Sequence, residues 1–86
     1  MRARRLPVLD RVDRQGEAVV LVDREVVRLS PLAVELVDSC DEWTEASDLA
    51  RAVVARFGPP PEGVDPTEAT VEALTALHDR GLVELD

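Results

Sequence analysis

The residue with the most reactive side chain in this 86-residue chain is its single cysteine, Cys40. A cysteine is nucleophilic as the thiolate, which forms readily only beside a base or positive charges. The neighbours Asp38, Asp41 and Glu42 are acidic and favour the protonated thiol instead. Cys40 also follows Leu36 by four residues, which places both on one side of a helix. We therefore expect a buried, structural cysteine.

The other groups with possible chemistry are isolated. The only histidine, His78, has no cysteine or histidine companion at metal-ligand spacing, and we expect it to be a partly buried core side chain one turn after Leu74. The carboxylates are scattered and form no acid–base pair. Gly58 and Gly63 are separated by prolines, so no glycine-rich phosphate loop is present. The sequence predicts no enzyme, no catalytic residue, no metal site and no cofactor.

The dipeptide Asp38-Ser39 introduces one alternative. In acyl carrier proteins, phosphopantetheine is attached to the Ser of an Asp-Ser pair at the start of a helix. Here Ser39 falls near the end of an expected helix and follows a region that is expected to form strands. The acyl carrier protein therefore remains the least favoured of the functions considered.

Charge is divided unevenly along the chain. Residues 1–15 hold five arginines against two aspartates, whereas the whole chain has a net charge of −8. Proteins that bind nucleic acids normally present a basic face. The last expected helix instead carries Glu68, Glu72 and Asp79 against Arg80 alone. We therefore expect no nucleic-acid partner.

The basic start of the chain is interpreted as a flexible N-terminus over residues 1–7, followed by one domain over residues 8–86. Its apolar run stops at Asp10, too early for a secretory signal, and no stretch approaches the length of a membrane span. One cysteine allows no internal disulfide, which agrees with a reducing compartment. The expected location is the cytoplasm, away from the membrane.

Strands are expected first, because residues 19–29 are rich in β-branched side chains. We place them at residues 8–14, 18–22 and 26–29, joined by turns at Gln15-Gly16 and Asp23-Arg24. A final short strand is expected in residues 81–85. The N-terminal region therefore predicts a three-stranded antiparallel sheet.

Three helices are expected after that sheet. The first begins with Ser30 as N-cap and Pro31 at its first position and ends near Asp41. The second covers residues 44–57 with Thr44 as its cap. Trp43 before it is expected to close one end of the core, or alternatively to anchor an interface. The third covers residues 65–80, where Asp65-Pro66-Thr67-Glu68 is a variant of the capping box. The fold class is therefore α+β.

The chain resembles the PqqD-like family, small peptide-binding domains also called precursor recognition elements of ribosomally made peptides. The resemblance covers roughly residues 17–85 and implies a winged helix-turn-helix. The matching segments are Val27-Arg28-Leu29-Ser30, residues 32–37, Asp41-Glu42-Trp43-Thr44, residues 49–57 and residues 74–83.

The residues themselves already favour peptide binding, because an edge strand leaves backbone N–H and C=O groups free to pair with an extended peptide. In the family that this chain resembles, a leader peptide adds to the third strand and packs against the last helix. Carried onto this chain, Thr70 and Ala73 face the cleft, and Leu74 and Leu77 line either cleft or core. The implied peptide-binding residues are Val26, Val27, Arg28, Leu29, Thr70, Ala73, Leu74, Leu77 and Arg80.

The resemblance implies a non-catalytic peptide chaperone that binds the leader of a precursor peptide and presents it to a separate maturation enzyme. That enzyme would be a protease of a split lasso-peptide system, a radical-SAM enzyme or a cyclodehydratase, and the sequence does not choose among them. It does not fix the oligomeric state either. The main alternative is a winged-helix transcription regulator, which needs a basic recognition helix.

Overall fold

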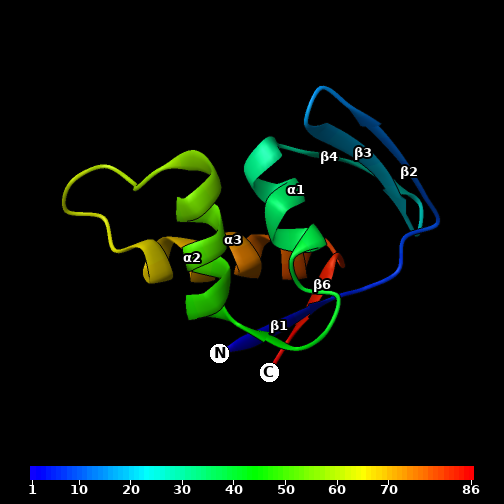
Figure 1. Cartoon of the computed structure of the whole chain (residues 1–86). Coiled ribbons are helices and arrows are strands. Elements are labelled where there is room, and N and C mark those ends of the chain that lie inside the picture. The colour runs from blue at the N-terminus through cyan, green and yellow to red at the C-terminus, as the bar shows by residue number, and fades with distance from the viewer.

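Three antiparallel strands form the sheet expected before the first helix (Figure 1). The computed structural model describes residues 1–86. The strands are β2 (Asp10–Arg14), β3 (Glu17–Val22) and β4 (Glu25–Leu29), in the order β2-β3-β4. Side chains alternate between an inner face, turned to the core, and an outer face. The sequence-based strands are confirmed, and each boundary lies within two residues of its expected place.

The turns of this sheet each use two residues. Gln15 (φ 54°) and Gly16 (φ 81°) both have the left-handed backbone that suits a tight hairpin. In the second turn Asp23 has a φ of 55°, a conformation that aspartate tolerates better than most residues. Short turns fix the register, in which Val20 lies opposite Val27.

Three helices follow at the expected places: α1 (Pro31–Asp38), α2 (Ala46–Phe57) and α3 (Pro66–Asp79). The Ser30 hydroxyl accepts a hydrogen bond from the backbone N–H of Ala33 at 3.2 Å. A carboxylate oxygen of Asp65 accepts one from the N–H of Glu68 at 3.3 Å. Both caps satisfy donors that a helix start leaves free. The α+β class is thereby confirmed.

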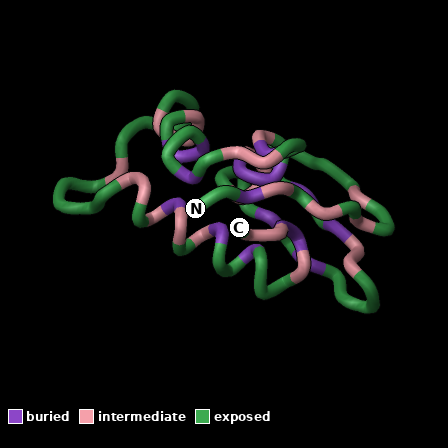
Figure 2. The backbone as a smooth tube through the Cα atoms, turned by 90° about the horizontal axis from the view of Figure 1, so that it is seen from below, coloured by how far each residue is buried: buried purple, intermediate pink, exposed green.

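The N-terminus differs from the expectation. Residues 1–7 were expected to be flexible, but Arg2–Arg5 forms strand β1 at the centre of a second antiparallel sheet of order β5-β1-β6. Its partners are the two-residue strand β5 (Thr44–Glu45) and the C-terminal strand β6 (Val83–Leu85). The two ends of the chain lie side by side (Figure 2). The partition into a flexible tail and a domain starting at residue 8 is therefore wrong.

Charge explains why a basic segment is ordered here. Arg4 donates to Glu84 of β6 at 3.0 Å, and Arg2 pairs with the C-terminal residue Asp86. The guanidinium groups of Arg2 and Arg4 also lie over the ring of Trp43, at 5.5 Å and 4.9 Å from its centroid. Each such contact is weak when exposed, but several converge on one short strand. The half-buried Trp43 thus packs on arginines, and it is not among the side chains packed against the hydrophobic core, where it was expected.

The start of α2 is also shifted. Thr44 was expected to cap it, but Thr44 pairs with Ala3 in the sheet and the helix begins at Ala46. The backbone N–H of Ala46 donates to the carbonyl of Met1 at 2.9 Å. The N-terminal strand therefore takes the place of a side-chain cap, a partner that sequence spacing does not reveal.

The core lies between the inner face of the β2-β3-β4 sheet and the helices (Figure 1). Helix α1 packs on β3 and β4, and α3 packs on α2 and β6. The largest fully buried side chains are Leu36, Leu49, Leu74, Leu82, Val83 and Cys40. None of the three helices is long and apolar enough to cross a membrane.

The role of β1 can be tested at Ala3, whose side chain is 0 % exposed in the middle of that strand. Ala3→Asp buries a carboxylate without a partner and should lower the free energy of unfolding by about 3 kcal/mol or more. Thermal unfolding followed by circular dichroism measures this, with a fall in Tm of more than about 10 °C expected. Leu9→Asp, at a side chain 71 % exposed, is the control and should change stability by less than about 0.5 kcal/mol. Equal melting of the two variants would show that β1 is dispensable.

Candidate functional site

Strand β4 has an open edge. Its only strand partner is β3, so one side of its backbone pairs with no other strand. Backbone groups on such an edge are a template for pairing with another extended chain. The residues expected to bind a peptide from this strand, Val26, Val27, Arg28 and Leu29, all lie in it.

The register shows which residues serve that edge. In a hairpin with a two-residue turn, the residues that flank the turn form a hydrogen-bonded pair, and bonded pairs then recur at every second position. Val22 and Glu25 flank the turn, so Val20 with Val27 is also a bonded pair. The N–H and C=O groups of Val26 and Arg28 therefore point away from β3, toward the open side.

The side chains divide in the same way. Val27 and Leu29 are on the inner face and are buried in the core. Val26, 68 % exposed, and Arg28, also exposed, are on the outer face. The two residues that offer free backbone thus also offer accessible side chains, whereas Val27 and Leu29 support the strand from beneath.

Strand β2, the opposite edge of the sheet, is protected by charge. By the same alternation its outward backbone belongs to Arg11 and Asp13. Arg11 Nε donates to Asp13 Oδ1 at 2.7 Å, and Arg11 Nη1 donates to Asp38 Oδ1 of α1 at 2.7 Å. The hydrogen bond from Arg11 lowers the pKa of Asp13, and the two carboxylates raise the pKa of Arg11. A charged edge fastened to a helix disfavours pairing with another strand.

The expected residues of the last helix only partly follow the expectation. Leu74 and Leu77 belong to the core, which was one of the two places expected for them, whereas Thr70 is buried although it was expected to face a cleft. Ala73 is half-buried against the core and Arg80 is exposed. The helix that packs on β4 is α1. Thr70 of α3 and Val26 of β4 therefore do not line a common cleft, and each lies in a different hollow of the surface.

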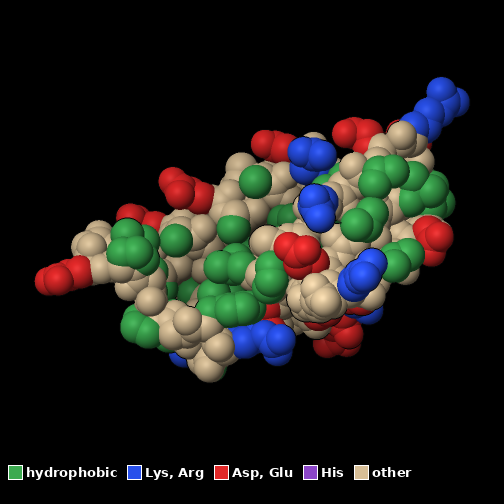
Figure 3. All heavy atoms as spheres, turned by 90° about the horizontal axis from the view of Figure 1, so that it is seen from above, with side chains coloured by type: hydrophobic (Ala, Val, Ile, Leu, Met, Phe, Trp, Pro, Cys, Tyr) green, Lys and Arg blue, Asp and Glu red, His purple; other side chains and the backbone are tan.

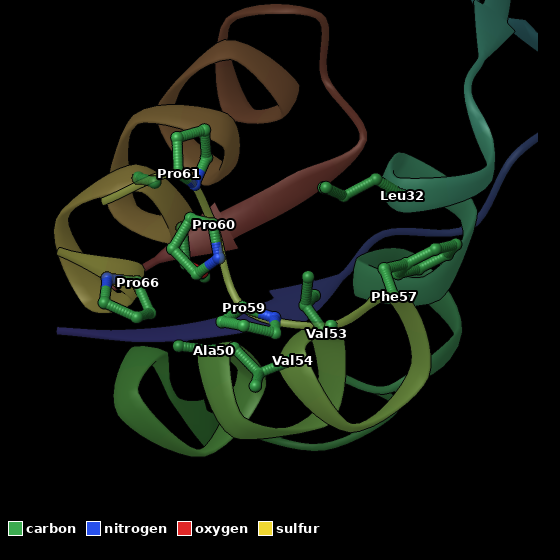
Figure 4. A pocket seen from close by; sticks show the side chains of 12 residues that line it. Leu32, Ala50, Val53, Val54, Phe57, Pro59, Pro60, Pro61 and Pro66 are labelled. Atoms are coloured by element: carbon green, nitrogen blue, oxygen red, sulfur yellow. The ribbon is translucent and has the colours of Figure 1, made fainter. Parts of the chain in front are cut away.

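Thr70 lines an apolar cavity of about 290 Å³ between the starts of α1 and α3, helix α2 and the proline loop (Figure 4). Leu32 and Phe57, 40 % and 43 % exposed, stand at its rim. Leu32 is three residues after Leu29, so the rim begins within about 11 Å of the end of β4. The lining residues are Leu32, Ala50, Val53, Val54, Phe57, Gly58, Pro59, Pro60, Pro61, Pro66, Ala69 and Thr70.

Sequence reasoning missed this cavity. It treated the proline loop after Phe57 as a stiff connector, and three of its prolines line the cavity. The available signal was the apolar character of Phe57 and Leu32 at positions where helices end or begin. Proximity of those two residues depends on how α1 and α2 pack, which spacing along the chain does not state.

The outer face of the β2-β3-β4 sheet carries a second apolar area. Val12, Val19 and Val26 are exposed there, on three adjacent strands. Hydrophobic side chains gather over this end of the molecule in Figure 3. An added strand beside β4 would extend this face.

The cysteine, the histidine and Ser39 do not lie together at the β4 edge or at the apolar cavity. Cys40 is buried as expected, whereas His78 was expected in the core and is exposed, with Nδ1 3.2 Å from the carbonyl of Val83. Ser39 lies at the end of α1, and its hydroxyl donates to Glu35 at 2.9 Å. No group of three or more His, Cys, Asp or Glu side chains lies close enough to hold a metal ion.

No family model, curated protein or solved structure matches this chain. The candidate site therefore rests on the open edge of β4 and the apolar cavity near its end.

Cys40 provides a test of burial. Its Sγ is 3.7 Å from the carbonyl of Val37, and desolvation raises the pKa of the thiol, against a smaller opposing effect of the Arg5 backbone N–H. Because the thiolate is the reactive form, iodoacetamide at pH 8 should alkylate the native protein at least about tenfold more slowly than the urea-unfolded protein. Mass spectrometry over time measures both rates. Equal rates would contradict the buried position.

Proposed function

We propose that this protein is a non-catalytic peptide-binding domain that takes up an extended peptide as an additional strand on β4. The observation that carries the proposal is the open β4 edge, where Val26 and Arg28 direct backbone groups away from the sheet. Pairing of this kind supplies affinity through the main chain, and pockets nearby supply specificity. It needs no catalytic group and no cofactor.

The apolar cavity supports the same function. Its rim lies within about 11 Å of the end of β4, so a peptide leaving the strand past Leu29 reaches Leu32 in three residues. An apolar side chain of the peptide would fill the cavity beside Phe57. The peptide would then be held by backbone pairing at one point and by apolar burial at the other.

The physiological ligand in this proposal is the leader of a ribosomally made precursor peptide, as the resemblance to the PqqD-like family implies. The protein would have the winged helix-turn-helix arrangement, act in the cytoplasm and present the peptide to a separate maturation enzyme. Docking both partners raises their effective concentration without any chemistry by the domain itself. The acidic surface of α3, with Glu68, Glu72 and Asp79 exposed, favours this function over DNA binding.

Titration tests the ligand. Synthetic peptides covering the short reading frames next to the gene, labelled with fluorescein, are titrated with the protein and followed by anisotropy. We expect one of them to bind with a Kd near or below micromolar, about −8 to −10 kcal/mol. Failure of all such peptides to bind would reject a leader-binding role.

Proline substitution tests the edge. Val26→Pro removes a backbone donor that faces the open side, while the ladder between β3 and β4 keeps its bonded pairs. Binding of the peptide should weaken at least about tenfold, close to 1.4 kcal/mol. Val26→Ile keeps the N–H, the branched shape and the apolar side chain and is the matched control, expected to lose less than about threefold. Thermal melting of both variants verifies folding, and unchanged binding by a folded Val26→Pro protein would place the peptide elsewhere.

A further inference from the structure

Most arginines of this chain are already neutralised by its own carboxylates. Six of the ten arginines make an ion pair, including every arginine of β1 and the β2 residue Arg11. The four without one are Arg14, Arg24, Arg28 and Arg80. In a chain with eighteen acidic residues, an arginine that stays unpaired is available to a partner.

Arg28 is the unpaired arginine on the open edge itself. It lies on the outer face of β4, opposite Val19 of β3 and two residues from Val26. The nearest acidic position on that face is Glu17, diagonal to Arg28 and opposite Arg14, and no ion pair joins them within 4 Å. The free side of Arg28 is therefore the side where an added strand would lie.

The position of Arg28 on the edge predicts which residue a bound peptide should carry opposite it. A residue directly opposite Arg28 on an added strand has its side chain on the same face, with Cβ atoms about 5 Å apart. A carboxylate there forms a favourable cross-strand pair, and a lysine or arginine there is repelled. Two positions along, the residue opposite Val26 meets an exposed apolar side chain and gains from being apolar itself.

We propose that Arg28 and Val26 determine the specificity of the β4 edge, which selects a peptide with Asp or Glu at one position and an apolar residue two positions away. This inference rests on the proposed strand addition. It holds for parallel or antiparallel pairing, because both place residues two apart opposite Arg28 and Val26. Orientation decides only which of the two comes first in the peptide.

The net charge of −8 does not oppose this preference at short range. At physiological ionic strength, charges more than about 8 Å apart on the surface are largely screened, so a carboxylate opposite Arg28 responds mainly to that guanidinium. Asp23 and Glu25 lie at the β3–β4 turn. These two carboxylates repel acidic peptide residues near the turn. The preference for Asp or Glu should therefore be strongest directly opposite Arg28.

A display selection with random peptides tests the proposal. Phage carrying random nine-residue peptides are selected on the wild-type protein, on Arg28→Glu and on Arg14→Glu. The control Arg14→Glu makes the same change in net charge at an unpaired arginine on β2, away from the open edge. Peptides that bind wild type but not Val26→Pro are kept as ligands of the β4 edge.

The expected result is enrichment of Asp or Glu two positions from an apolar residue with wild type and Arg14→Glu, and of Lys or Arg at that same position with Arg28→Glu. For one selected peptide measured by anisotropy, Arg28→Glu in the protein or Glu to Lys in the peptide should each weaken binding about tenfold. The two changes together should restore most of the affinity, which shows that the two residues meet.

Two other outcomes separate the possible failures. If edge ligands are selected but their charge preference is the same on wild type and Arg28→Glu, Arg28 does not determine specificity, and strand addition at β4 stands. If every selected peptide binds Val26→Pro as well as wild type, or if none is selected, the β4 edge is not a peptide site. The proposed function is then rejected together with this inference.

Discussion

The fold depends on the position of one basic strand between acidic segments from the middle and the end of the chain. Strand β1 pairs with β5 on one side and with β6 on the other, so it joins residues far apart in sequence. The residue before β1 also supports the start of α2, because the carbonyl of Met1 accepts a hydrogen bond from the N–H of Ala46. Arg4 pairs with Glu84 and stacks on Trp43. The positive charges of β1 are thus matched by carboxylates within the molecule.

Both edges of the β2-β3-β4 sheet have unpaired backbone groups, but only the β2 edge is protected by ion pairs. On β2, the outward positions carry Arg11 and Asp13, and Arg11 is fastened to Asp38 of α1. On β4, the outward positions carry Val26, which is uncharged, and Arg28, which makes no ion pair within the chain. Natural sheets usually protect an exposed edge. The contrast therefore marks β4, and not β2, as the edge suited to receive another strand.

Local signals in the sequence were enough to predict the elements that depend on neighbours along the chain. Ser30-Pro31 and Asp65-Pro66 each mark a helix start, because a cap and a proline act within one turn. Gln15-Gly16 marks a hairpin for a similar reason.

Strands β1 and β5 were missed because their pairing is non-local and Arg2–Arg5 has no apolar alternation. The placement of Leu74 and Leu77 in the core, and of Thr70 beneath the surface, required the packing of α3 on α2 and β6, which periodicity alone does not specify. Strand order predicted an open edge, the resemblance placed the peptide on the third strand, and which residues of that strand face outward followed only from the register.

The arginines of this chain divide into six that make ion pairs within the fold and four that make none. The arginines of β1 form ion pairs and pack on Trp43. Few apolar side chains hold the β5-β1-β6 sheet, and Ala3 is the only buried residue of β1. At the β2-β3-β4 sheet, the buried side chains Ala18, Val20, Val27 and Leu29 hold the strands to the helices. Because apolar packing holds the β2-β3-β4 sheet to the helices, the fold does not require an ion pair at Arg28. A charge that the fold does not need at an open edge can change at little cost in stability, whereas a change at Arg4 removes its ion pair with Glu84 and its contact with Trp43.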